Sequence, residues 1–105
     1  MAAAATSRIV FNEFAKIGLQ VGQIVKAVPF PKARNPSYQV TVDFGDRTLT
    51  TSAQLPSNYP DIQSLFGKTV IGITNLPERR IGGFKSQFLM VGFPDAHGHV
   101  QLLNT

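Results

Sequence analysis

The strongest constraint on the fold is a strict alternation of apolar and polar residues near the middle of the chain. The segment Tyr38–Phe44 reads YQVTVDF, so that every second residue is apolar. Side chains of a β-strand point alternately to its two faces, and this pattern therefore predicts a strand with one face in a core. Gly45 and Asp46 form the next turn, and the threonine-rich segment Arg47–Ser52 is predicted to return as another strand. The sequence thus indicates a mainly β fold.

A longer strand is predicted upstream, over Leu19–Val28, where branched residues with high strand propensity are frequent. Regular alternation places two sets of side chains on opposite faces: Val21, Val25 and Ala27 on one, Ile24 and Val28 on the other. Gly22 interrupts the run, which suggests a bulge or a sharp bend of the kind that lets one strand serve two sides of a small barrel. Prolines end this strand and stiffen the following loop.

Two short helices are predicted outside these strands. Ile9–Ile17 carries apolar residues at helical spacing, with Asn12 as a candidate N-cap before Glu13. In the segment Gln54–Lys68, three apolar residues follow the i, i+3, i+4 pattern before Gly67, a residue that suits a helix end. The three are Ile62, Leu65 and Phe66.

The rest of the chain predicts short strands. Val70–Asn75 and Phe88–Phe93 are apolar strand candidates, and a turn over Ala96–His99 leads into a last strand at Val100–Leu103. Together the elements match a five-stranded OB-fold barrel with a short N-terminal helix and a short helix between the third and fourth strands. SH3-like barrels and split α+β domains share much of this order and are alternatives at this level.

Composition narrows the function classes. The chain has 105 residues, of which 43% are hydrophobic and 15% charged, and this predicts one globular domain over residues 9–105 behind a flexible tail of residues 1–8. It has no cysteine, which excludes disulfides and thiolate catalysis and favours a reducing cytoplasm. No apolar run reaches the length of a membrane span. We therefore expect a cytoplasmic protein without membrane insertion.

Catalytic and metal-binding motifs are not evident. His97 and His99 flank Gly98 with only Asp95 nearby, and such a terminal turn suits exposed polar residues better than metal ligands. No nucleophile elbow, phosphate-binding loop or paired-carboxylate motif brings Ser, His and Asp together. We expect a non-enzymatic protein without a cofactor.

Basic residues gather in two loops. Ten Lys and Arg against six Asp and Glu give a net charge of +4, which favours anionic partners. The cations are Lys32 and Arg34 in the proline-rich loop and Arg79, Arg80 and Lys85 in the connection that follows Asn75. The second loop also contains Phe84 and a Gly-Gly pair, which permits a sharp turn and a close approach. We predict that the two loops converge on one binding patch.

Each candidate also has a purely structural alternative. Exposed arginines are often only solvated charges. Phe84 suits a core position as well as it suits ligand contact, and Phe30 suits packing better than exposure. Ser52 and Gln54 stand at a strand end, where such residues often satisfy local hydrogen bonds, and Asn75 suits the cap of a turn.

Three motifs carry a family resemblance. They are PFPKARNPSYQVTVDFG at Pro29–Gly45, TSAQL at Thr51–Leu55 and NLPERRIGGFKSQFLMVG at Asn75–Gly92. With their spacing preserved over most of the chain, they resemble the CsaA family of secretion-related chaperones. That family is part of a wider tRNA-binding-domain superfamily, which also occurs in methionyl-tRNA synthetases and in small stand-alone tRNA binders.

The resemblance implies an OB-fold homodimer without enzymatic activity. The CsaA branch implies binding of exported precursor proteins and of the translocation motor, and the other branch implies recognition of tRNA. Together with the basic loops, it gives these ligand-binding candidates: Phe30, Lys32, Arg34, Ser52, Gln54, Asn75, Arg79, Arg80, Phe84 and Lys85. The chain departs from the family pattern at Gly18–Gly22, in place of a common Asp-Ile-Arg-x-Gly, and at Gln87, in place of a common Glu.

Three functions are open on this basis. A chaperone that binds non-native precursor polypeptides as a dimer is favoured, because the net charge is modest and the chain has eight phenylalanines for apolar contacts. Structure-specific tRNA binding through the basic loops is the alternative, since tracking phosphates requires several cations. An accessory subunit that docks on a larger enzyme is the third.

Overall fold

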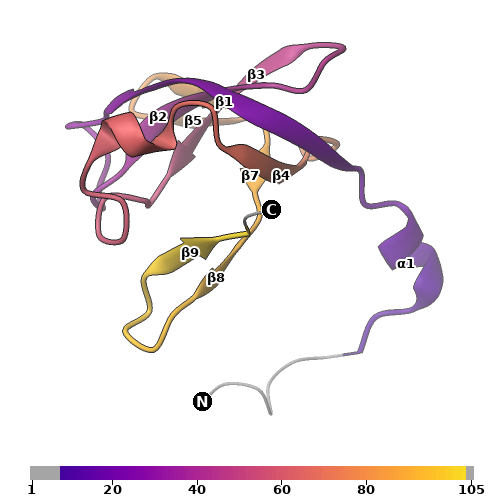
Figure 1. Ribbon diagram of the computed structural model, residues 1–105. Coiled ribbons are helices and arrows are strands. Elements are labelled where there is room, and N and C mark those ends of the chain that lie inside the picture. The colour runs from indigo at the N-terminus through magenta and orange to yellow at the C-terminus, as the bar shows by residue number, and fades with distance from the viewer. Residues whose placement is uncertain (1–7, 104–105) are drawn as a thin grey trace.

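The protein folds into a small β-barrel. The computed structural model describes residues 8–103 and contains an antiparallel five-stranded sheet in the order β3-β2-β1-β4-β7 (Figure 1). Its strands are β1 (Leu19–Pro29), β2 (Tyr38–Asp43), β3 (Thr48–Ala53), β4 (Thr69–Ile73) and β7 (Leu89–Met90). The sheet curls into a nearly closed barrel of the OB type, which confirms the predicted fold class. The predicted flexible tail, residues 1–8, lies outside the described residues except for Arg8.

The alternation at the centre of the sequence produces strand β2 as predicted. Its Tyr38, Val40 and Val42 side chains and the following Phe44 are at most 8% exposed. The polar residues between them are half-buried or exposed. Strand β2 pairs antiparallel with β1 on one side and β3 on the other, so its apolar face covers the middle of the core.

The long strand β1 departs from its predicted faces. Its pairing with β2 shifts register after Ile24, which makes Val25 an extra, bulged residue. Because of this bulge, Ala27 turns inward on the side of Ile24 and is 5% exposed, and the prediction that it shares a face with Val25 is wrong. The bulge is therefore not at Gly22. Gly22 instead permits a close approach, since a Cβ there would lie 2.5 Å from a side-chain carbon of strand β2.

Hydrogen bonds between strand β3 and the segment that precedes β7 close the barrel. The Gln87 N–H donates to the Thr50 carbonyl at 2.7 Å, and the Thr51 hydroxyl donates to the Phe88 carbonyl at 2.8 Å. These bonds join the two edge strands of the sheet. The threonines of β3 thus serve the closure, because their hydroxyls supply bonds where no regular ladder continues.

The predicted strand Phe88–Phe93 is divided between two sheets. Strand β7 pairs with β4, whereas β8 (Gly92–Pro94) leaves the barrel and pairs with β9 (Val100–Leu102). Gly92 lies at this crossing, where a Cβ would come within 2.9 Å of a backbone oxygen of β9. The prediction of one continuous strand is wrong, while the turn predicted over Ala96–His99 does connect β8 to β9.

A second small hairpin, which the sequence did not predict, occupies the connection between β4 and β7. Strands β5 (Arg79–Ile81) and β6 (Phe84–Ser86) pair antiparallel across Gly82 and Gly83. Both glycines have positive φ, a conformation that glycine adopts without steric strain. The basic loop of the sequence is thus an ordered hairpin.

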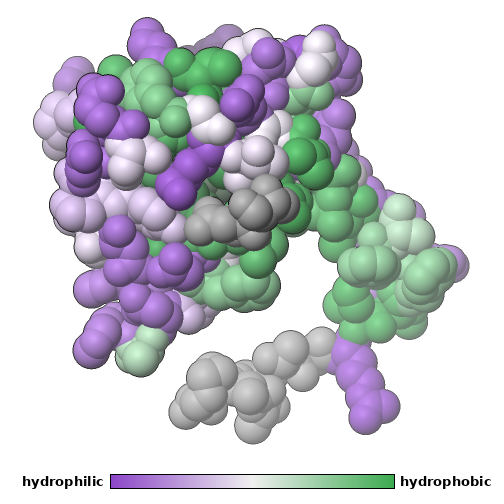
Figure 2. Space-filling model, in the orientation of Figure 1, coloured by the Kyte–Doolittle hydropathy of each residue, from purple (hydrophilic) through white to green (hydrophobic). Residues whose placement is uncertain are grey.

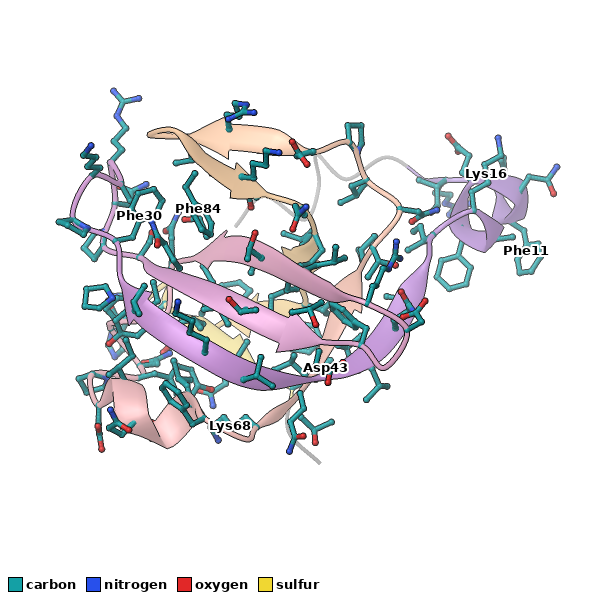
Figure 3. All side chains as sticks on the ribbon, turned by 90° about the horizontal axis from the view of Figure 1, so that it is seen from above. Phe11, Lys16, Phe30, Asp43, Lys68 and Phe84 are labelled. Atoms are coloured by element: carbon teal, nitrogen blue, oxygen red, sulfur yellow. The ribbon has the colours of Figure 1, made fainter. Side chains whose placement is uncertain are left out.

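The N-terminal helix is shorter than predicted. Helix α1 spans Phe11–Ala15 and begins after Val10, whose N–H donates to the Glu13 carboxylate at 3.2 Å. The prediction of Asn12 as N-cap is wrong. No residue of α1 is buried, and the helix stands away from the barrel in two perpendicular views (Figures 1 and 3). The side of the helix that Figure 2 shows is largely apolar.

The link between β3 and β4 contains the second predicted helix as a single 3₁₀ turn, η2 (Ile62–Leu65). The Asp61 carboxylate caps it by accepting a backbone N–H of the turn at 3.1 Å. Gly67 follows with a φ of +84°, as a glycine stop requires. Leu65 is completely buried but Phe66 is 44% exposed, so the predicted apolar face forms only in part.

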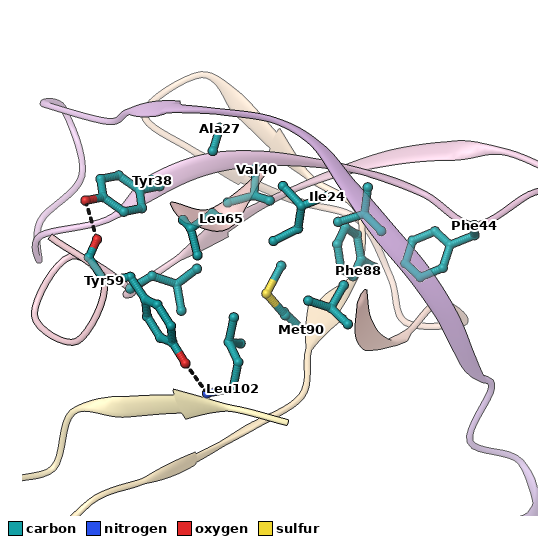
Figure 4. Packing of buried hydrophobic residues seen from close by; sticks show 13 residues of the cluster. Ile24, Ala27, Tyr38, Val40, Phe44, Tyr59, Leu65, Phe88, Met90 and Leu102 are labelled. Carbon is teal, nitrogen blue, oxygen red and sulfur yellow. Dashed lines mark hydrogen bonds between the residues drawn. The ribbon is translucent and has the colours of Figure 1, made fainter. Parts of the chain in front are cut away.

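The core lies inside the barrel and extends to the β8–β9 hairpin (Figure 4). Tyrosine hydroxyls link the two parts. The Tyr38 hydroxyl donates to the Tyr59 carbonyl at 2.8 Å, and the Tyr59 hydroxyl accepts the Leu102 N–H at 3.0 Å. Elsewhere in the core, the rings of Phe44 and Phe88 pack edge to face with their centroids 5.1 Å apart. Packing and hydrogen bonds together fix the hairpin to the barrel.

Candidate binding groove

A groove of about 670 Å³ opens between the β1–β2 loop, the end of β3 and the β5–β6 hairpin. Arg34 of the first loop and Arg79 of the hairpin both line it. Nearby, a Cβ on Gly82 would lie 3.4 Å from the Cβ of Lys32, so the two chain segments are in contact. These observations confirm the prediction that the two basic loops converge.

The groove combines three kinds of surface. Ile81 and Phe88 contribute apolar area, and Phe88 is buried beneath it. Ser52 and Gln54, at the end of β3, contribute hydroxyl, amide and backbone groups. The exposed arginines contribute positive charge. Such a combination suits an extended ligand with both apolar and anionic groups.

A second hollow of about 420 Å³ lies beside the groove, between the tip of the β5–β6 hairpin and the β1–β2 loop. Phe30 and Phe84 line it, with ring centroids 5.4 Å apart (Figure 3). Phe30 is 5% exposed, as the packing interpretation predicted, while Phe84 is half-buried. Lys32 lines the same hollow and is exposed, which places a cation beside the aromatic pair.

Other predicted site residues lie outside both hollows. Arg80 and Lys85 are opposite each other in the β5–β6 ladder and are exposed. The Asn75 side chain is engaged at the junction of α1 and β1, where it accepts the Gly18 N–H at 2.7 Å and donates to the Lys16 carbonyl. Asn75 thus fixes this junction in the way that the cap interpretation suggests.

Several groove residues were not among the predicted site residues. They include Ser37, Thr51, Leu76, Phe88 and Leu89. The leucines are 46% and 53% exposed, although apolar residues beside strands are usually assigned to a core. For the two leucines, the one indication of a site in the sequence is that they lie in the same motif as Arg79.

An exposed apolar face extends from α1 onto the sheet. We define this apolar face as Phe11, Phe14, Leu19 and Val21, which are 77%, 51%, 54% and 64% exposed. Leu19 lies opposite Ile73 in the β1–β4 ladder, and Val21 lies opposite Ile71, so half-buried isoleucines continue the face across β4. Figure 2 shows apolar side chains over α1 and the adjoining barrel. Contiguous exposed apolar surface commonly marks an interaction site.

The C-terminal turn carries the two histidines. Asp95 accepts the backbone N–H groups of His97 and His99 at 2.9 and 3.0 Å, and accepts the Asn58 side chain at 3.0 Å. These hydrogen bonds, with that from Asn58 foremost, lower the pKa of the Asp95 carboxyl below its ordinary value. Across residues 8–103, no group of three His, Cys, Asp or Glu residues is arranged to hold a metal ion. No helix in that range is long and apolar enough to cross a membrane.

Comparison with known proteins places these features in a family. The model of the putative tRNA binding domain matches residues 19–105, which include the whole barrel and every predicted site residue. The chain belongs to the putative tRNA binding domain family. This membership confirms the resemblance to the tRNA-binding-domain superfamily that the three motifs indicated.

Solved structures extend the match to three dimensions. The CsaA chaperone of Picrophilus torridus superposes with a TM-score of 0.86 at 34% sequence identity, and covers 93% of this chain and 91% of its own. The CsaA of Bacillus anthracis gives 0.85 at 33%, covering 94% and 90%. A methionyl-tRNA synthetase related protein of Pyrococcus horikoshii gives 0.79 at 25%, covering 95% and 90%. The chain therefore is of the CsaA type within the putative tRNA binding domain family.

Curated relatives include much longer proteins. The methionine–tRNA ligase of Chloroherpeton thalassium is 32% identical over 96 residues, which are 91% of this chain but 13% of the ligase. That of Thermococcus kodakarensis is 35% identical over 81% of this chain and 11% of its own length. This chain thus corresponds to about an eighth of the length of these ligases, and most of it matches the model of the putative tRNA binding domain.

Proposed function

We propose that this protein is a non-enzymatic chaperone whose groove binds extended segments of non-native polypeptides, exported precursors among them, in the cytoplasm. The groove between Arg34, Phe88 and Arg79 carries the proposal, because it joins apolar surface to two guanidinium groups. The groove offers an accessible strand edge, hydroxyl groups and apolar side chains. These can contact the free main-chain groups and the apolar side chains that an unfolded polypeptide presents. The CsaA chaperones among the structural neighbours support this assignment.

A titration of a labelled peptide tests this function. The probe is a short fluorescein-labelled peptide of alternating glutamate and leucine, followed by anisotropy with the intact protein. We expect saturable binding with a Kd of about 1–100 μM, as for other transient contacts. Replacing Arg34→Ala and Arg79→Ala together should weaken binding about tenfold, because two charge-assisted contacts are lost.

Arg47→Ala is the matched control. Arg47 is also exposed, but it follows β2 at the strand end opposite the groove, beside the β2–β3 turn. Its loss should leave the peptide Kd unchanged within about twofold. Absence of saturable binding by the wild-type protein would remove the chaperone proposal, and equal effects of both variants would remove the groove as its site.

A second candidate function is structure-specific tRNA binding. The description of the family favours it, as does the cationic surface around the Phe30–Phe84 pair, where Lys32 is exposed. Arg80 and Lys85 extend this charge along the hairpin. Cations of this kind suit phosphates, and the half-buried ring of Phe84 suits stacking with an unpaired base.

Gel shifts with tRNA over a series of salt concentrations test this function. Arg79→Ala with Arg80→Ala should weaken binding and reduce the salt slope by about 1–2, one unit for each lost phosphate contact. The Arg47→Ala variant again serves as control. A slope that does not change in the double variant would assign any tRNA binding to another surface.

We further propose that the protein acts as a homodimer joined through the apolar face. An isolated five-residue helix is not stable in water, so α1 requires a surface to pack against. The chain offers both an exposed apolar helix and an exposed apolar strand surface at Leu19 and Val21. In a two-fold dimer, each helix would cover the strand surface of the other copy. Each of the two equivalent contacts would bury both an apolar helix and an apolar strand surface.

Sedimentation velocity tests the dimer. Val21→Lys should convert the dimer to monomers, because a charged side chain would be buried at its centre. Phe66→Lys is the control, since Phe66 is 44% exposed but lies beside η2 and not on the apolar face. A monomeric wild-type protein at micromolar concentration, or equal behaviour of the two variants, would contradict the dimer.

A further inference from the structure

The outer edge of strand β3, which faces away from β2, is hydrogen-bonded to side chains as well as to main chain. Thr50 uses both backbone groups away from β2: its carbonyl accepts the Gln87 N–H at 2.7 Å, and its N–H donates to the Gln87 side chain at 3.0 Å. In an antiparallel ladder, residues two apart send their backbone groups to the same side. The N–H and the carbonyl of Ser52 therefore also point outward, away from β2.

A side chain, and not another strand, covers this edge at Ser52. The Ser52 N–H donates to the Ser86 hydroxyl at a long 3.3 Å. The Ser52 carbonyl receives only a weak 3.4 Å contact from the Thr51 hydroxyl within the described part of the chain, and that hydroxyl makes its shorter bond, 2.8 Å, to Phe88. Ser52 is half-buried and the next-but-one residue, Gln54, is exposed. The strand edge is thus within reach of a ligand.

This edge lies inside the groove. Ser52, Gln54 and Ser86 all line it, together with the apolar side chains of Ile81 and Phe88. The closing seam of the barrel runs along β3 as far as Ser52, and the groove begins where the seam ends. An extended segment laid in the groove would therefore meet the edge of β3 at Ser52.

We propose that the polypeptide ligand binds by adding a short strand to the outer edge of β3 at Ser52. The groove then recognises mainly the main chain of the ligand and, to a lesser extent, its side chains. The inference rests on the proposed chaperone function and specifies how that function recognises its substrate. One ligand residue exchanges two hydrogen bonds with Ser52, donating to its carbonyl and accepting its N–H in place of the Ser86 hydroxyl. Clients of many sequences share this main chain, and binding is correspondingly tolerant.

Side chains of the ligand then supply a limited preference. Successive residues of a strand point to opposite faces, so every second ligand side chain can reach the half-buried Ile81 and the exposed Leu89. The exposed guanidinium groups of Arg34 and Arg79 favour carboxylates on the ligand through charge complementarity. The preferred occupant is an extended polypeptide with apolar residues next to acidic ones. RNA offers no repeating N–H and carbonyl pair for this edge, and RNA binding in the groove is the competing outcome.

N-methylation of the peptide tests this mode with the wild-type protein. A non-repeating form of the probe is used, with one leucine between glutamates, so that a shift of register would lose the apolar contact. Each of its backbone nitrogens is methylated in turn, and the Kd of each peptide is measured by anisotropy. A methyl group on a nitrogen that faces β3 removes one hydrogen bond and blocks the approach of the strands. We expect it to weaken binding about tenfold, whereas methylation of the adjacent nitrogens should change the Kd less than about twofold.

The result separates this inference from the proposed function. Saturable binding with one sensitive nitrogen, or with sensitive nitrogens two residues apart, supports strand addition. Saturable binding in which no nitrogen is sensitive overturns strand addition and leaves the chaperone function in place. No binding of the unmethylated peptide overturns both. Displacement of the bound peptide by tRNA with no sensitive nitrogen would assign the groove to RNA.

Discussion

The two small hairpins of this protein have the same architecture but opposite surroundings. β5–β6 and β8–β9 each consist of two three-residue strands, and each turns through glycine with positive φ. The β8–β9 hairpin is tied to the barrel at several points. Tyr59 accepts the Leu102 N–H, Asn58 donates to Asp95 and to the Val100 carbonyl, and Leu102 is 4% exposed.

The β5–β6 hairpin has no buried residue, although hydrogen bonds of Lys85 and Ser86 to β3 also tie it to the barrel. The half-buried ring of Phe84 packs on Phe30, and the Lys85 carbonyl accepts the Thr50 hydroxyl at 2.8 Å. Its cations are exposed, and Arg79 lines the groove. Hairpin geometry therefore does not assign a role. The two hairpins differ in burial instead: the buried Leu102 anchors β8–β9, whereas β5–β6 has no buried residue and contributes to binding in the function proposed above.

Removing the Tyr59 side chain should have the largest effect on the anchored hairpin. Tyr59 is 8% exposed and belongs to the core cluster, and its hydroxyl also accepts the Gln101 side chain at 3.3 Å. We expect Tyr59→Ala to lower the free energy of unfolding by about 3–5 kcal/mol, as for other buried aromatic residues. Urea denaturation measures this loss in the free energy of unfolding.

The Tyr59→Phe variant separates packing from hydrogen bonding. It keeps the ring and leaves the Leu102 N–H without its acceptor, at a cost of about 1–3 kcal/mol. If Tyr59→Ala costs no more than Tyr59→Phe, packing contributes nothing to this anchor and the contrast between the hairpins fails.

Removing the Phe84 ring should have a smaller effect on stability and a larger one on binding. Because Phe84 is half-buried, Phe84→Ala should cost about 1–2 kcal/mol, less than a fully buried aromatic residue. The peptide Kd should rise about fivefold, since Arg79 belongs to the same hairpin. Phe84→Leu, which keeps most of the apolar contact, is the control. A cost as large as that of Tyr59→Ala would make Phe84 a core residue and remove the contrast.

The same difference explains which hairpin the sequence revealed. The β8–β9 turn was predicted because Gly98 and polar neighbours punctuate an otherwise apolar region. The β5–β6 strands were missed, because short, mostly exposed strands lack the apolar alternation that sequence patterns detect. Strand β2 was predicted correctly because its apolar face is covered along its whole length, which gives its sequence a regular apolar alternation.

Long-range geometry was the other limit of the sequence. The bulge at Val25 depends on how β1 pairs with β2, and local propensity carries no such information. For the groove, the two clusters of cations in the sequence and the family resemblance led to the prediction that the loops of Lys32 and Arg79 converge. The sequence did not predict the apolar part, since Phe88 and Leu89 resemble ordinary strand residues until the closing seam places them beside Ser52.

Matched glycine substitutions sharpen the comparison of the hairpins. Gly82 has a φ of +54° and Gly98 a φ of +80°, so alanine at either position is strained by about 1–2 kcal/mol. A Cβ on Gly82 would also contact Lys32 Cβ and Phe30 Cζ at 3.4 and 3.5 Å, whereas a Cβ on Gly98 would meet no atom within 4 Å. We expect similar losses of stability from both variants by thermal melting. Only Gly82→Ala should weaken peptide binding, and a matching loss in Gly98→Ala would contradict the division of roles.

The smallest effect concerns the pH dependence of the anchored hairpin. Hydrogen bonds from Asn58 and from the backbone at His99 and His97 stabilise the charged carboxylate, and so the pKa of Asp95 is lower in the folded chain than in the unfolded one. The unfolded chain therefore takes up the proton first as the pH falls. The stabilisation is fully present above the ordinary aspartate pKa and disappears as the pH falls through the lower, folded pKa.

Asp95→Asn tests this by urea denaturation at a series of pH values. At neutral pH the variant should be less stable than the wild type, and the difference should begin to shrink below about pH 4, where the Asp95 carboxyl of the unfolded wild-type chain takes up its proton. Arg79→Ala, on the binding hairpin, should leave the acid dependence of the wild type unchanged. A difference between Asp95→Asn and wild type that stays constant down to the lowest pH would mean that the turn gains nothing from the ionised carboxylate. The anchoring of β8–β9 would then rest on the contacts of Tyr59 and Leu102 and on the Asn58–Val100 hydrogen bond.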